Sequence, residues 1–184
     1  NFIKILLIYS GSTFFIIFLY SLVNLRLLDS FNLAFTTIST GGFIPIDNLS
    51  NILINNLQIL IFSIALLIPI FNFFLIHDLI TSKFSLKDHK EDIHLGILII
   101  ILTLLIYFFV TPDDEFVNVF FAITSSISTS GITSYETNFD LSILYILLTI
   151  VGGSLISVSS GFKYTRIYIL LKISYQEIYR LVKP

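Results

Sequence analysis

The sequence predicts an all-α integral membrane protein made of two tandem repeats, each with a helix, a re-entrant loop and a second helix. Three observations predict this class. Hydrophobic residues make up 55% of the chain and charged residues only 12%, about half the charged share of a typical soluble domain. Two uncharged runs end in similar turns of Ser, Thr and Gly. The distribution of Lys and Arg then indicates how these two runs lie in the membrane.

Four apolar runs are long enough to cross a bilayer, which takes about 20 residues in a helix. They are Ile5–Leu25, Asn48–Ile76, Leu95–Pro112 and Leu141–Phe162. The second run is longer than a crossing needs, and Pro69 within it is expected to kink the helix.

Two further uncharged runs, Ser30–Ile46 and Phe116–Tyr135, are less apolar than these four. Each starts with hydrophobic residues and ends rich in Ser, Thr and Gly. Such a run either crosses the membrane or enters it halfway and turns back. The second arrangement gives a half-helix followed by a polar turn.

The charge distribution separates these two arrangements, because cytoplasmic loops carry an excess of Lys and Arg. If both runs are re-entrant, Lys4, the Lys83–Lys90 loop and the basic C-terminal segment share one side, and Arg26 is the basic residue opposite. If both runs cross, the Lys83–Lys90 loop lies opposite the other two basic segments. The re-entrant arrangement is therefore predicted, with both ends of the chain in the cytoplasm. The acidic residues predicted outside are Asp29, Asp47, Asp113, Asp114, Glu115, Glu136 and Asp140.

An internal repeat supports the same arrangement. A shift of 89 residues (131 − 42 = 89) places Gly131 on Gly42, and it aligns the flanking spans in the same order. Chance similarity between low-complexity segments is the alternative. The pairs of matching residues are Phe31 with Phe120, Ile38 with Ile127, Ser39 with Ser128 and Thr40 with Thr129. The predicted division is a first repeat at 1–80, a cytoplasmic loop at 81–92, a second repeat with a broken span at 93–172, and a cytoplasmic tail at 173–184.

The polar turns have the chemistry of a cation site. Irregular backbone at membrane depth must be buried in protein or line a watery path. Carbonyl oxygens can replace the water shell of a potassium ion, and glycine lets successive carbonyls point the same way. The C-terminal end of a half-helix favours a cation. A contact between helices through small residues is the structural alternative.

A third polar segment interrupts the last span. Gly152, Gly153 and Gly161 lie among four serines, and each glycine costs a helix up to about 1 kcal/mol. This stretch is expected to unwind, as spans do along transport paths. A tight helix–helix contact is the alternative.

These segments together resemble a known family, the Trk/Ktr/HKT superfamily of cation transporters, in its TrkH-type branch. FNLAFTTISTGGFIPIDN resembles the family's second pore loop, and FFAITSSISTSGITSYE resembles its third. VGGSLISVSSGFKYTR resembles the Gly-rich interruption of the third repeat, which ends in Gly-x-Lys-x-x-Arg. The resemblance covers essentially the whole chain. It implies an internal fragment with the second and third repeats of a four-repeat, pseudo-fourfold pore.

The resemblance also implies site residues and a function, which is the passage of potassium, or sodium in some members, across the plasma membrane. Ile156, Val158, Ser159 and Ser160 depart from the family's small or Gly/Thr positions. The implied selectivity filter is Ser39, Thr40, Gly41, Gly42 and Phe43 with Ser128, Thr129, Ser130, Gly131 and Ile132. The implied gate loop comprises Gly152, Gly153, Ser157, Ser160 and Gly161, with Lys163 and Arg166 at its cytoplasmic end.

The implied partners are the lipid bilayer, the remaining pore repeats, a second copy in a homodimer and a cytosolic nucleotide-binding regulatory subunit. No cofactor is expected, and the one metal ion expected is the transported cation. The net charge of −2 indicates no nucleic-acid surface, and no catalytic constellation is visible. His77-Asp78 is interpreted as an interfacial pair, with a proton relay as the alternative. A broken-helix transporter of a small solute and a non-transporting scaffold are the competing functions.

Overall fold

A computed structural model describes residues 2–45, 49–81, 89–112, 114–133 and 141–182 of the chain. Within these ranges every regular element is helical, apart from one isolated bridge between Val151 and Phe162. The α-helices are α1 (Phe2–Leu22), α2 (Leu27–Ser39), α3 (Asn56–Leu67), α4 (Phe73–Ile80), α5 (Lys90–Phe109), α6 (Phe116–Ile127), α7 (Ser142–Ile150) and α8 (Tyr164–Val182), with a short 3₁₀ turn η1 at Leu49–Asn51.

Two of the described helices, α1 and α5, are long and apolar enough to cross a bilayer. Their apolar segments, Ile3–Leu22 and Lys90–Phe109, have mean hydropathies of 2.0 and 2.4. Each is followed by a half-length helix, α2 after α1 and α6 after α5. The element order therefore repeats as a long helix, a short helix and a polar turn, as the shift of 89 residues predicts.

The other two predicted spans are not continuous helices, and for the first of them this corrects the sequence expectation. Within Asn48–Ile76, α3 ends at Leu67 and α4 begins at Phe73. Pro69 explains this break, because its ring removes a backbone donor and clashes with the preceding turn. The kink predicted there is in fact a complete interruption of the helix.

Within Leu141–Phe162 only α7 is helical, and residues 151–163 are irregular before α8 begins. The unwinding expected around Gly152 and Gly153 is confirmed. α8 then runs through the predicted boundary between residues 172 and 173 without interruption. The segment predicted as a cytoplasmic tail is therefore largely the second half of this helix.

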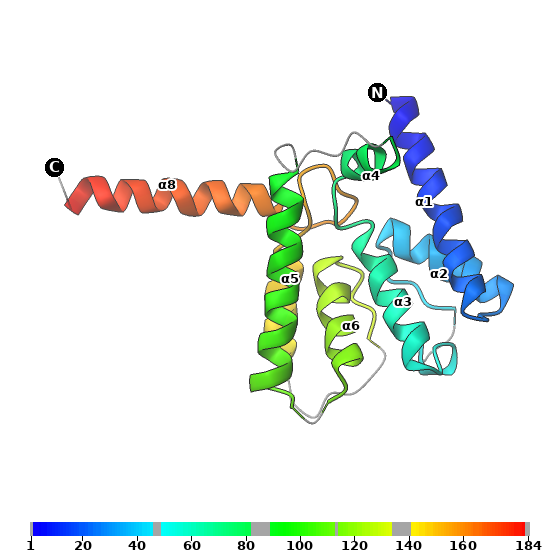
Figure 1. The fold of residues 1–184 in the computed structure, drawn as a ribbon. Coiled ribbons are helices and arrows are strands. Elements are labelled where there is room, and N and C mark those ends of the chain that lie inside the picture. Colours follow the sequence, from blue (N-terminus) through cyan, green and yellow to red (C-terminus); the bar gives the residue numbers. More distant parts are fainter. Residues whose placement is uncertain (1, 46–48, 82–88, 113, 134–140, 183–184) are drawn as a thin grey trace.

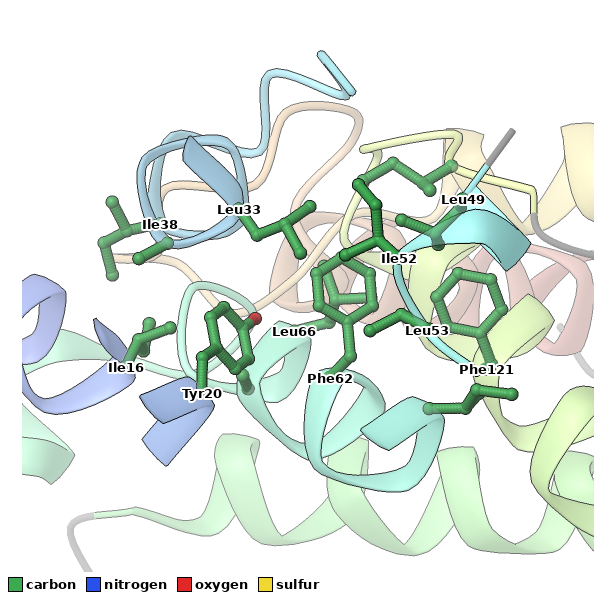
Figure 2. Packing of buried hydrophobic residues seen from close by; sticks show 14 residues of the cluster. Ile16, Tyr20, Leu33, Ile38, Leu49, Ile52, Leu53, Phe62, Leu66 and Phe121 are labelled. Carbon is green, nitrogen blue, oxygen red and sulfur yellow. The ribbon is translucent and has the colours of Figure 1, made fainter. Parts of the chain in front are cut away.

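The buried hydrophobic residues form two clusters, each with residues from both repeats, and α3 packs against α6 across the boundary between the repeats. Phe62 of α3 lies with its ring centroid 5.8 Å from that of Tyr20 and 5.6 Å from that of Phe121. All three side chains are almost fully buried. Figure 2 shows them in one cluster with Leu53 and Leu66. The buried Tyr20 hydroxyl also meets Thr37 Oγ1 at 2.9 Å, which fixes α2 against α1.

The arrangement places the second short helix, α6, inside the bundle, whereas α2 packs mainly against α1 and keeps one face exposed. Figure 1 shows α6 between α5 and α3, while α1 lies on the far side of α3 from α5. α8 extends away from the other helices (Figure 1). Some predicted outer and loop residues lie outside the described ranges, namely Asp47, Lys83, Lys87, Asp113, Glu136 and Asp140.

Candidate functional site

The two polar turns adopt the same backbone conformation. Thr40 and Gly42 have φ angles of 53° and 72°, and the equivalent Thr129 and Gly131 have φ angles of 64° and 63°. Each turn thus has two left-handed residues, with one residue between them, shortly after the end of a short helix. The repeat seen in the sequence is therefore a repeat of backbone geometry and not a chance similarity of composition.

Each helix end is closed by its own turn. Thr40 N–H donates to the Thr37 carbonyl at 3.2 Å, and Thr129 N–H donates to the Ser126 carbonyl at 3.0 Å. A β-branched residue is rarely left-handed. Here the Thr40 hydroxyl donates to the preceding carbonyl of Ser39 at 2.7 Å, and the Thr129 hydroxyl does the same to Ser128 at 2.5 Å. These local hydrogen bonds help to hold the strained conformation.

The two turns also touch each other. A Cβ atom on Gly42 would lie 2.2 Å from the carbonyl oxygen of Ser130. Such a distance is impossible for a side chain, so this position needs glycine for both its space and its positive φ. At Gly131 no described atom comes within 4 Å of the corresponding Cβ position. Equivalent glycines thus have different surroundings within this chain.

Serine hydroxyls organise the second turn more than the first. Ser125 Oγ donates to the Ile132 carbonyl at 2.6 Å, and Ser128 Oγ donates to the Ser125 carbonyl at 2.9 Å. Ser130 Oγ joins them, 2.9 Å from Ser128 Oγ. In the first turn, Ser39 Oγ donates back into its own helix, to the Phe35 carbonyl at 2.7 Å.

The last predicted positions of the two turns differ in burial. Phe43 is 83% exposed, whereas Ile132 is 2% exposed and packs in the core. The side chains at this position are therefore not equivalent, although the preceding backbone is.

The segment from Gly152 to Gly161 forms a closed excursion from the helix path. Gly152 N–H donates to the Phe162 carbonyl at 2.9 Å, and Phe162 N–H donates to the Ile150 carbonyl at 2.8 Å. These bonds bring the two ends of the excursion together. A Cβ on Gly152 would lie 2.0 Å from the Ser160 carbonyl oxygen, and Gly161 has a φ of 82°. We call residues 152–161 the intramembrane loop.

The break between α3 and α4 receives this loop. Ser154 N–H donates to the Ile70 carbonyl at 2.9 Å, and Val158 N–H donates to the Pro69 carbonyl at 3.1 Å. In return, Phe73 N–H donates to the Ile156 carbonyl at 3.1 Å. Sequence reasoning missed this partnership. Its available signal was Pro69, since a break in mid-span frees carbonyls that need donors.

The intramembrane loop also reaches the second polar turn. Ser160 donates to Thr129 Oγ1 twice, from its N–H at 3.1 Å and from its hydroxyl at 2.9 Å. Of the residues proposed for the filter and the gate, the structure therefore brings Thr129 and Ser160 into direct contact.

Lys163 points back into the loop and not away from it. Its ammonium donates to Ser157 Oγ at 2.9 Å, to the Ser157 carbonyl at 3.1 Å, and closely to the Ser159 carbonyl. The sequence predicted that Lys163 and Arg166 both lie at the cytoplasmic end of the loop. Arg166 is exposed, on the first turn of α8.

A polar cluster joins α4 to the start of α5. Asp78 lies 3.1 Å from His77 Nδ1 and 3.1 Å from His89 Nε2. Asp92 Oδ1 accepts a hydrogen bond from Asn72 N–H at 2.9 Å. His77-Asp78 is thus part of a wider structural network, and within the described ranges no group of acidic or His side chains has the geometry of a metal site.

Taken together, the apolar helices, the repeated half-helix and turn, and the interrupted last span define a class. The chain is a helical membrane protein with two pore-loop repeats in tandem. No family model and no curated protein sequence matches the chain. A solved structure does match, the potassium transporter TrkH from Vibrio parahaemolyticus, with a TM-score of 0.81 and 26% sequence identity.

The match covers 96% of this chain and 41% of that chain. The chain therefore has a TrkH-type fold over nearly its whole length, and it spans about two fifths of the length of the TrkH protein it matches. This confirms the resemblance seen in the sequence and the predicted all-α membrane fold class.

Proposed function

We propose that this chain belongs to a TrkH-type transporter that takes up potassium ions through a carbonyl-lined filter. Ser39–Phe43 and Ser128–Ile132 would each supply one side of the filter. The observation that carries this proposal is the matched pair of left-handed turns that meet at Gly42 and Ser130.

The geometry suits a monovalent cation. α2 and α6 both end at these turns, so the negative ends of two helix dipoles are directed toward the same region. In the sequence, no Lys or Arg occurs in either polar turn. Neutral carbonyl and hydroxyl oxygens are the ligands that replace the hydration shell of potassium in selective pores.

Two turns supply only part of a ring. Gly42 is closed off by the neighbouring turn, whereas the Cβ position of Gly131 meets no described atom within 4 Å. Two further repeats would close the ring by placing the next turn beside Gly131. A homodimeric assembly and a cytosolic nucleotide-binding regulatory subunit, as the family resemblance implies, complete the proposed transporter.

The intramembrane loop would act as its gate. It contacts Thr129 directly and is fixed by backbone hydrogen bonds to the break around Pro69. The loop is therefore held by two sets of contacts, and breaking them would open a path below the filter. The test of this role is deletion of residues 154–159 in the full-length protein, which should raise the cation flux.

The proposed location is the plasma membrane, with both ends of the chain on the cytoplasmic side. The chain has no cysteine, so single cysteines can be placed without a background from this region. Cysteines at Lys90 and Glu115, at opposite ends of α5 and its following turn, should be labelled from opposite sides. Labelling of both from outside would contradict the topology.

Rubidium uptake by proteoliposomes containing the full-length protein tests the proposed function. Uptake should be strong and should fall when unlabelled potassium is added, while the same concentration of sodium should compete less. Equal competition by sodium would instead assign the sodium-permeable alternative. No rubidium uptake would contradict transport of monovalent cations.

A further inference from the structure

We infer that Ser157 and Ser159 form a monovalent-cation site inside the intramembrane loop, and that the Lys163 ammonium occupies this site as a tethered cation. The inference rests on the proposed function, because it places a cation, the Lys163 ammonium, inside the proposed gate loop. It starts from the three oxygens around Lys163 Nζ, which are Ser157 Oγ at 2.9 Å, the Ser157 carbonyl at 3.1 Å and the nearby Ser159 carbonyl.

All three oxygens are neutral. Within the described ranges no carboxylate makes an ion pair with Lys163, and the ion pairs that occur there involve other residues. Lys163 is half-buried, so its ammonium loses part of its water, which is costly. Glu91, whose carboxylate accepts from Leu155 N–H at 2.9 Å, acts on this ammonium from nearby without forming a direct ion pair. Here two carbonyls and one hydroxyl replace the water, which is how a selective pore holds potassium.

The turn around Lys163 is built and not accidental. Ser157 Oγ donates to the Ser154 carbonyl at 2.7 Å, which leaves its lone pairs for the ammonium. Ser159 Oγ accepts from Gly153 N–H at 2.8 Å, which fixes the residue whose carbonyl faces Lys163. The Pro69 carbonyl accepts hydrogen bonds from the backbone N–H groups of Val158 and Ser159 and so holds this segment. The oxygens are therefore held in place by bonds that do not involve Lys163.

A cation on a tether has a consequence for conduction. Lys163 lies three residues from Ser160, whose N–H and hydroxyl both bond to Thr129 in the filter turn. The oxygens of Ser157 and Ser159 would then be unavailable to a potassium ion that leaves the filter, because the Lys163 ammonium occupies them. Withdrawal of Lys163 would free this oxygen cage, so the ammonium and the transported ion compete for the same oxygens.

The test uses the full-length protein with Lys163→Met and Lys163→Gln, which remove the charge and keep most of the side-chain stem. Crystals of the variants are soaked in thallium ions, whose anomalous scattering marks potassium sites. Density is expected between Ser157 and Ser159 in both variants and is expected to be absent with native Lys163. Lys163→Arg, which keeps the positive charge, is the matched control and should show no density there.

A second measurement is the rise in unfolding temperature on adding potassium chloride, with choline chloride as the control salt. Potassium should raise the unfolding temperature of both neutral variants more than that of the native protein. Adding Ser157→Ala to each variant should remove this extra rise. Absence of thallium density together with equal potassium stabilisation would overturn the inference. Failure of both variants to fold even in potassium would also overturn it, since a free cation should replace the ammonium.

These readouts do not depend on transport. If rubidium uptake by the native protein fails but thallium fills the cage in Lys163→Met, the cation site stands and the proposed function falls. If uptake succeeds but the cage stays empty, the proposed function stands and this inference falls.

Discussion

The backbone carbonyl of Ser130 lies where a side chain on Gly42 would have to begin, 2.2 Å from the ideal Cβ position. This contact joins the polar turn of one repeat to that of the next. It is direct structural support for the two turns forming one site. It also makes Gly42 a position where a single added methyl group should be strongly destabilising.

Gly42→Ala should therefore destabilise the full-length protein. The added Cβ meets a positive φ, which costs about 1–2 kcal/mol, and it overpacks against Ser130, which typically costs a further 1–3 kcal/mol. Thermal unfolding in detergent is the measurement. Gly11→Ala is the control, because nothing lies within 4 Å of its Cβ position in α1. Equal melting temperatures for the two variants would show that the turns do not touch.

Thr129→Val should loosen the intramembrane loop. Valine keeps the shape but removes the oxygen that accepts from Ser160 N–H and Ser160 Oγ. Ser160 is exposed in this chain, so each lost hydrogen bond should cost about 0.5–1.5 kcal/mol. We expect a higher basal rubidium flux in proteoliposomes, because the loop loses its contact with the second polar turn, the proposed filter segment.

Thr40→Val is the matched control for this change. Thr40 has the same left-handed backbone, but its hydroxyl donates to the adjacent Ser39 carbonyl and makes no hydrogen bond to the loop within the described part of the chain. Any strain of a valine at positive φ is thus present in both variants. An equal rise in flux for the two substitutions would mean that Ser160 does not hold the loop through Thr129.

Asp92→Ala should destabilise the segment between α3 and α4 that binds the intramembrane loop. The 4% exposed Asp92 accepts from Asn72 N–H, which lies between the carbonyl of Ile70 and the amide of Phe73. Loss of this acceptor should cost about 1–3 kcal/mol, and amide exchange at Phe73 should become faster. Asp92→Asn keeps an oxygen in place and should stay close to the native protein. If alanine and asparagine behave alike, the Asn72 contact does not support the break.

Much of this fold could be predicted from the sequence because its strongest features are local. The apolar runs predicted α1 and α5, and the 89-residue shift predicted the equivalent turns at Gly42 and Gly131. Those features depend on residues close together in the chain. The left-handed Thr40 and Thr129 were not predicted, because a β-branched residue is an unusual choice there.

Contacts between distant residues were the part that sequence could not supply. Val158 bonds to Pro69 and Ser160 bonds to Thr129, and no spacing rule connects these pairs. The kink expected at Pro69 became a full break, since the freed carbonyls there are used by the intramembrane loop. The direction of Lys163 was likewise hidden, because a long flexible side chain can reach outward or back.

Gly131→Ser tests the central claim most directly. No described atom lies within 4 Å of its Cβ position, so the expected effect comes from the positive φ of 63° or from a neighbouring repeat in a closed ring. Both would turn a filter carbonyl away from the ion. The measurement is the potassium-to-sodium permeability ratio of the full-length protein in proteoliposomes, with insertion yield as the folding control. We predict a ratio several-fold lower than that of the native protein at equal yield. A well-inserted Gly131→Ser protein with the native ratio and rate would contradict the claim that these turns line a potassium filter.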